Sequence, residues 1–115
     1  MPWRGVDVVI VIQTSMLLSE REKIVAWELA NMLPMVFGYP QYTRAGGLVS
    51  YGVDLPSCYY RTAYFVDKIL HGIAPGDLPV EFPSKLLLVI NIKTAKALGL
   101  TVPSSLLVRA DEVIE

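Results

Sequence analysis

An α/β domain with a parallel sheet at its centre is the fold class that the sequence predicts, and two observations lead to it. Residues 5–13 read GVDVVIVIQ, a β-branched apolar run typical of a strand that is covered on both faces. A helical pattern over residues 20–32 and a short strand at 35–37 follow it. Strand, helix and strand at this spacing predict a βαβ unit, in which we expect a right-handed crossover and a parallel sheet.

The rest of the chain continues the alternation of strands and helices. The helix at 20–32 carries apolar residues at Ile24 and Val25 and ends before Pro34. Gly46-Gly47 precedes the third strand, and we expect these glycines to permit positive φ and close backbone approach. Further strands are predicted at 48–51, 85–91 and 112–114, and further helices at 57–70, 94–98 and 103–109.

Length and composition limit the class of protein. With 115 residues the chain fits one domain. Its 53% hydrophobic and 18% charged residues make it more apolar and less charged than an ordinary soluble domain. This composition indicates a sheet covered on both faces or an apolar surface that awaits a partner. The net charge is -1 and no basic run occurs, so the electrostatic footprint of a nucleic-acid-binding protein is missing. No apolar run approaches the ~20 residues that span a bilayer, and a single cysteine excludes an intrachain disulfide.

Few residues of this sequence suit catalysis. The only histidine, His71, falls at the end of a predicted helix, where we expect it to be solvated. Cys58 lies at a tyrosine-rich helix start and is interpreted as a small buried apolar residue. The glycines match neither GxGxxG nor GxxxxGKS, and no cluster of ligands predicts a metal site. The sequence therefore predicts a protein that is not an enzyme, with no cofactor and no metal.

Hydroxyl groups and tyrosine rings gather after three of the predicted strands. In open α/β sheets, ligands bind beyond the carboxyl ends of the strands. Hydroxyls pair with a carboxylate or an amine while a ring stacks on a flat group, so this set suits a small polar ligand with an apolar part. The alternative is that the two tyrosines only cover the sheet edge. The candidate ligand-binding residues are Thr14, Ser15, Tyr39, Ser50 and Tyr51.

Two other groups are interpreted as structural. Arg61 is expected to be solvated or to form a salt bridge with Asp54. The aromatic residues Tyr60, Tyr64 and Phe65 recur along one predicted helix, and we expect them to belong to the core rather than to a ligand cage.

The second half of the chain carries a resemblance to a known family. From Gly46 it reads GGLVSYGVDLP, then YYRTAYFVDKILHG, PGDLPVEFPSKLLLVINIKTAKALGL and TVPSSLLVRADEVIE. This order resembles the end of the periplasmic substrate-binding proteins of ABC transporters, in the branch that includes tryptophan- and tyrosine-binding components. The resemblance implies a type I periplasmic-binding-protein fold with two lobes, of which this chain holds a truncated three-layer lobe with a parallel sheet.

The resemblance also implies how the chain is divided and what it does. Residues 1–78 would form the C-terminal lobe, and residues 79–115 a hinge-crossing strand and helices that return to a missing N-terminal lobe. The function implied is that of the solute-binding component of an ABC importer, which binds a small ligand such as an aromatic or other amino acid between its lobes and delivers it to a permease. The family is periplasmic, whereas the lack of a signal peptide would place this chain in the cytoplasm if it is the complete product.

The sequence is also compatible with two other functions. In one, the chain is a non-catalytic interaction module with little or no ligand binding. Its strand at Lys85–Asn91 has no parent sheet in the same chain, so two copies pair or exchange it to form a homodimer. In the other, the chain is an enzyme or a receiver-like regulator, but the segments after the first and third strands lack the acidic residues that a receiver needs.

Overall fold

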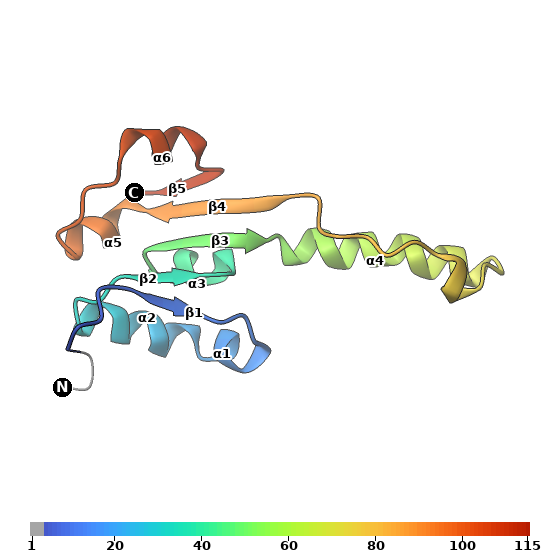
Figure 1. Cartoon of the computed structure of the whole chain (residues 1–115), viewed down its shortest axis with the longest axis horizontal. Coiled ribbons are helices and arrows are strands. Elements are labelled where there is room, and N and C mark those ends of the chain that lie inside the picture. The colour runs from blue at the N-terminus through green and yellow to red at the C-terminus, as the bar shows by residue number, and fades with distance from the viewer. Residues whose placement is uncertain (1–3) are drawn as a thin grey trace.

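Residues 4–115 are described by a computed structural model, in which a sheet of five strands lies at one end and a helical arm projects from it (Figure 1). The strands follow one another across the sheet in the order in which they occur along the chain. They are β1 (Val9–Val11), β2 (Met35–Phe37), β3 (Val49–Val53), β4 (Leu86–Asn91) and β5 (Glu112–Ile114).

The helices connect these strands and have very different surroundings. α2 and α3 pack on the sheet near β1, β2 and β3, whereas α4 extends away from it (Figure 1). The helical elements are α1 (Ser15–Ser19), α2 (Arg21–Ala30), α3 (Pro40–Arg44), α4 (Leu55–Leu70), the 3-10 turn η1 (Pro75–Asp77), α5 (Ile92–Ala97) and α6 (Ser104–Arg109).

The predicted parallel βαβ arrangement is confirmed. β1 and β2 are parallel with Val9 opposite Met35, and β2 and β3 are parallel with Phe37 opposite Ser50. β4 runs antiparallel to β3, and β5 is parallel to β4. The fold is therefore mixed α/β with a mostly parallel sheet, and β1, β2 and β3 end at the same edge.

One of two buried clusters of the core lies between the sheet and the helices α2 and α3. Val25 of α2, Met35 and Phe37 of β2, and Tyr42 of α3 are buried together. The rings of Phe37 and Tyr42 are stacked with their centroids 4.6 Å apart. The Gly46 φ of 114° and the close approach of Gly47 to the Phe37 ring confirm the conformation expected of this glycine pair.

The expectation that the first strand is covered on both faces is wrong. Val9 and Val11 pack against the core, but Ile10 is 74% exposed and Ile12 is 73% exposed. β1 is the edge strand of the sheet, and alternate side chains of a strand point to opposite faces. One face of β1 is buried by α1 and α2, while the other keeps its apolar side chains at the surface.

The expectation that Lys85–Asn91 has no parent sheet in this chain is also wrong. β4 pairs with β3 over five residue pairs, from Val49 opposite Ile90 to Val53 opposite Leu86, and with β5 on its other side. Val89 and Ile90 are buried. Residues from both of the expected regions, 1–78 and 79–115, thus share one sheet. A homodimer formed through an unpaired Lys85–Asn91 strand loses its basis, because the strand already has two neighbours.

A second apolar surface that lacks a cover lies on α4. None of the residues of α4 is buried, and Tyr60 is 86% exposed, so the expectation that Tyr60, Tyr64 and Phe65 belong to the core is wrong. The radius of gyration is 17.6 Å, whereas a compact domain of this length has about 13 Å. The difference comes from the arm formed by α4 and the segment that returns from it, which lengthens the molecule to 56 × 33 × 21 Å.

Candidate ligand-binding edge of the sheet

The carboxyl ends of β1, β2 and β3 meet in a close contact of three residues. Gln13 follows β1, Gly38 follows β2, and Gly52 lies near the end of β3. The side-chain Nε2 of Gln13 donates a hydrogen bond to the carbonyl oxygen of Gly38 over 2.7 Å. This bond ties the segment after β1 to the segment after β2 at the edge where α/β sheets bind ligands.

The two glycines are required by this contact. A Cβ at Gly38 would lie 1.9 Å from Nε2 of Gln13, so the Gln13 side chain occupies the space that a side chain at Gly38 would need. A Cβ at Gly52 would lie 1.9 Å from the carbonyl oxygen of Gly38 and 2.8 Å from Nε2 of Gln13. Because backbone atoms cannot move aside as a side chain can, Gly52 is the less replaceable of the two.

Four of the five residues predicted to bind a ligand lie around this contact. Thr14 follows Gln13 and caps α1, where its Oγ1 accepts a hydrogen bond from the Leu17 amide over 3.1 Å. Ser15 is the exposed first residue of α1. Tyr39 follows Gly38, caps α3 and packs partly against the core. Tyr51 precedes Gly52 and is 58% exposed. The role of these residues in binding stays a prediction.

Ser50 differs from the other four. It lies inside β3 opposite Phe37 and is fully buried, and its Oγ has no hydrogen-bond partner within the described residues. Because successive side chains of a strand point to opposite faces, Ser50 faces the core while Tyr51 faces solvent. The two therefore do not converge, and Ser50 has no path to a ligand at this edge in the present conformation.

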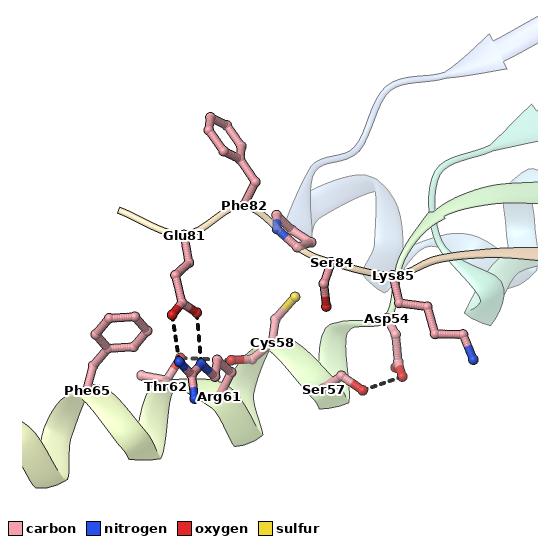
Figure 2. Close-up of a pocket in the computed structure, with 11 residues that line it drawn as sticks. Asp54, Ser57, Cys58, Arg61, Thr62, Phe65, Glu81, Phe82, Ser84 and Lys85 are labelled. Carbon is pink, nitrogen blue, oxygen red and sulfur yellow. Dashed lines mark hydrogen bonds and ion pairs between the residues drawn. The ribbon is translucent and has the colours of Figure 1, made fainter. Parts of the chain in front are cut away.

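A cavity of about 580 Å³ lies beside the same edge, between the start of α4 and the segment that returns to β4 (Figure 2). Its lining includes Asp54, Ser57 and Cys58 from the α4 side and Glu81, Phe82 and Lys85 from the returning segment. Asp54 directly follows β3 and Lys85 directly precedes β4, so the cavity opens where these antiparallel strands begin and end.

Three charged groups of the cavity already have polar partners within the chain. Arg61 donates to Glu81 through Nε over 2.8 Å and through Nη2 over 2.6 Å, and Asp54 accepts a hydrogen bond from the Ser57 hydroxyl over 2.6 Å (Figure 2). The Arg61 guanidinium holds the pKa of Glu81 below its usual value. Arg61 thus pairs with Glu81 rather than with Asp54, a partner that lies 20 residues away in sequence. Cys58 is half-buried beside this pair.

A buried carboxyl group lies at the opposite edge of the sheet, where the strands begin. Glu28 of α2 is 0% exposed, and its Oε1 accepts a hydrogen bond from the Met35 amide over 2.8 Å. Burial raises the pKa of Glu28 to about 7, although the hydrogen bond from the Met35 amide acts in the other direction. Glu28 therefore holds the start of β2 against α2, and the sequence offered no signal for it because it interrupts an apolar helix face.

Among residues 4–115, no group of three or more His, Cys, Asp and Glu side chains is placed to hold a metal ion. Within the same residues, no helix is long and apolar enough to span a bilayer. His71 caps the end of α4, with its Nδ1 3.3 Å from an oxygen of Asp67 and its side chain 76% exposed, as expected from its position in the sequence.

The family model of the ABC transporter substrate binding protein matches residues 3–114. The chain belongs to the ABC transporter substrate-binding protein family. The resemblance, expected from Val6 onward and most specific in residues 46–115, is thereby confirmed over nearly the whole sequence. No curated protein matches the sequence.

Solved structures agree with the family. A conserved domain protein from Vibrio cholerae O1 biovar El Tor is 30% identical, with a TM-score of 0.87 over 93% of this chain and 36% of that one. An ABC domain from Streptococcus pneumoniae in complex with L-Trp is 30% identical, with a TM-score of 0.88 over 96% of this chain and 38% of that one. A ligand-free, open substrate-binding protein with adhesive properties from Clostridium difficile, 24% identical, shares the fold with a TM-score of 0.66 over 98% of this chain and 38% of that one.

This member of the substrate-binding family spans between 36% and 38% of the length of these solved structures. Its sheet and the edge around Gln13 therefore correspond to part of a longer protein in each of them.

Proposed function

We propose that this chain forms the C-terminal part of the solute-binding component of an ABC importer and supplies one wall of its ligand site. The observation that carries the proposal is the shared carboxyl edge of β1, β2 and β3, which brings Thr14, Tyr39 and Tyr51 around one contact in a fold similar, at 30% identity, to a domain solved with L-Trp. Ligands of open α/β sheets bind at this edge.

The chemistry of the edge favours an amino acid, and an aromatic one suits it well. Thr14 and Ser15 offer hydroxyl groups, and Tyr51 offers an exposed ring on which a flat side chain can stack. Tyr39 adds a ring at the end of β2. One wall leaves most of a ligand in water, whereas sites for small molecules bury 70–90% of the ligand surface. We therefore expect weak binding by this chain and stronger binding when a second lobe closes over the edge.

The arm is the part of the chain that we expect to meet this second lobe. Tyr59, Ala63, Val66 and Leu70 follow one another along α4 at intervals of four, three and four residues, so they lie on one face of the helix. All four are exposed; Tyr59 is 74% and Leu70 is 79% accessible to solvent. An uncovered apolar face of this kind marks a surface that another element covers in the assembled protein.

The partners follow from the family. Delivery to an ABC permease and a periplasmic location belong to this proposal, and they apply to the longer protein of which such a lobe is part. The crossing between the lobes would then be made by α4 and the segment that returns to β4, and not by β4, which lies inside the sheet.

Titration of the isotope-labelled chain with L-Trp, followed by NMR, tests the proposal. We expect the amide signals of Thr14, Tyr39 and Tyr51 to move in a saturable way, with millimolar affinity. The variants Tyr39→Ala and Tyr51→Ala should weaken binding, and the matched control Tyr60→Ala on the exposed arm should not. Signals that stay fixed, or that move only in the arm, would contradict the proposed ligand site.

A further inference from the structure

The amide of Gln13 is a polar group at this edge that the sequence analysis did not select. Its side chain is exposed, and one N–H of Nε2 is used by the hydrogen bond to the Gly38 carbonyl. Because a carbonyl oxygen only accepts, this bond fixes which end of the amide is nitrogen and which is oxygen. Gln13 is therefore held in one orientation rather than moving freely in solvent.

The held amide keeps hydrogen-bonding capacity that nothing in residues 4–115 uses. A glutamine amide has two N–H donors and an acceptor oxygen. The bond to Gly38 uses one donor, and no other hydrogen bond of this side chain is present in the described part of the chain. One N–H and the oxygen Oε1 remain available at the edge, side by side on a rigid planar group.

The residues that meet Gln13 at this edge, and their chain neighbours Thr14, Tyr39 and Tyr51, are uncharged. Thr14 follows Gln13 in the chain. Gly38, which lies against the Gln13 amide, is followed by Tyr39. A Cβ at Gly52 would lie 2.8 Å from Nε2 of Gln13, and Gly52 is preceded by Tyr51. A group of one sign satisfies only one end of the free amide, whereas a group with one donor and one acceptor side satisfies both ends. The edge thus suits a ligand whose positive and negative groups are adjacent and cancel.

We propose that Gln13 is a ligand-contacting residue that determines specificity, its free N–H binding the carboxylate and its Oε1 binding the ammonium group of a zwitterionic amino acid. The inference rests on the proposed function, since it concerns the same edge of the sheet. Gly38 acts as a positioning residue in it, because the absence of a side chain there leaves the space that the Gln13 amide occupies.

The test uses the full labelled chain and three probes that share an indole ring: L-Trp, tryptamine, which lacks the carboxylate, and indole-3-propionate, which lacks the amine. The side-chain amide signal of Gln13 should move on titration with L-Trp. The variant Gln13→Ala should weaken L-Trp binding about two- to tenfold, the range expected for lost hydrogen bonds. Its preference for L-Trp over both analogues should shrink by a similar factor, an effect that a purely structural role would not produce.

Asn31→Ala is the matched control. The side-chain amide of Asn31 also donates to a backbone carbonyl, that of Trp27, over 2.8 Å, but it lies at the end of α2, near the opposite edge of the sheet. Its loss should leave affinity and preference unchanged. Gly38→Ala provides a second variant, because an added methyl group displaces the Gln13 amide without removing it, and it should reproduce the loss of preference seen in Gln13→Ala.

The outcomes separate the two proposals. In one outcome, L-Trp moves the signals of Tyr39 and Tyr51 but not the side-chain signal of Gln13, and Gln13→Ala keeps the full preference for L-Trp over both analogues. That outcome refutes the role of Gln13 and leaves the ligand site standing. If no probe moves any signal at this edge, the proposed function fails and the inference fails with it. Thermal unfolding of each variant shows whether the fold is kept, and the exposed position of Gln13 predicts that it is.

Discussion

The sheet and the arm have similar apolar side chains and opposite surroundings. In the sheet, Met35, Phe37 and Val89 are at most 2% exposed, because α2, α3 and the neighbouring strands cover them. In the arm, Tyr59, Tyr60 and Leu70 are more than 70% exposed, and α4 has no buried residue. The sheet therefore contains the buried core described here, although one face of β1 stays exposed, whereas the apolar residues of the arm face a surface that the rest of residues 4–115 does not supply.

The largest effect that this comparison predicts is a difference between two phenylalanines. Phe37→Ala removes a ring that is 1% exposed and stacked on Tyr42, and it should lower the free energy of unfolding by about 3–5 kcal/mol. Phe82→Ala removes a ring of the arm that is 89% exposed and should change it by less than about 0.5 kcal/mol. Urea denaturation measures both; equal losses would show that the arm packs against the sheet.

A smaller effect is expected from the buried carboxyl group of the sheet. The pKa of Glu28 is about 7 in the folded chain, above the ordinary value of 4.5, so the folded state binds the proton more tightly than the unfolded state. The stability that this proton contributes is complete below pH 4.5 and is lost as pH rises through 7, a decrease on the order of 2–3 kcal/mol. Denaturation at a series of pH values measures it.

Glu28→Gln should remove most of this pH dependence while the amide oxygen still accepts the hydrogen bond from Met35. Glu22→Gln is the control, because Glu22 lies exposed on the same helix and its replacement should leave the dependence in place. If the wild-type chain were equally stable at pH 5 and pH 8 once the exposed groups are accounted for, the carboxyl group would not be buried in solution.

A third prediction concerns the apolar face of α4. Replacing Val66 and Leu70 together by glutamate should reduce the binding of the dye ANS, because their exposed side chains form part of the apolar surface. The free energy of unfolding should stay within about 0.5 kcal/mol of its original value, since neither residue is buried. Ser104→Glu, an exposed position of α6, is the control for added charge. A large loss of stability would mean that this face is covered in solution.

The smallest effect is expected at the surface ion pairs. Arg61→Ala breaks the contact with Glu81 that holds the returning segment to α4, so amide hydrogen exchange should become faster in residues 78–85. Arg44→Ala breaks the comparable pair with Glu112, which joins α3 to β5 inside the sheet region, and should leave exchange in 78–85 unchanged. Faster exchange of the arm in both variants would argue against an independent role of the Arg61–Glu81 pair.

Much of the fold could be predicted from local patterns. The β-branched run before Gln13, the apolar pattern of the helix at 20–32 and the break at Pro34 follow from side-chain sterics and from a period of two or 3.6 residues. These act over short distances in the chain. Because a crossover connection joins parallel strands, the βαβ pattern then placed Thr14, Tyr39 and Tyr51 at one edge. These parts of the prediction needed no knowledge of distant contacts.

What the sequence alone did not determine was which strand lies beside which, and which apolar face is covered. The run LLLVI of β4 reads as a buried strand in any sheet, and only the pairing with β3 and β5 decided that it belongs to this one. The burial of Ser50, the exposure of Ile10 and Tyr60, and the contact of Gln13 with Gly38 were likewise decided by elements far apart in sequence. The physical reason is that propensity and periodicity are properties of neighbouring residues, whereas burial and hydrogen-bond partners depend on the surfaces that meet once the chain has folded.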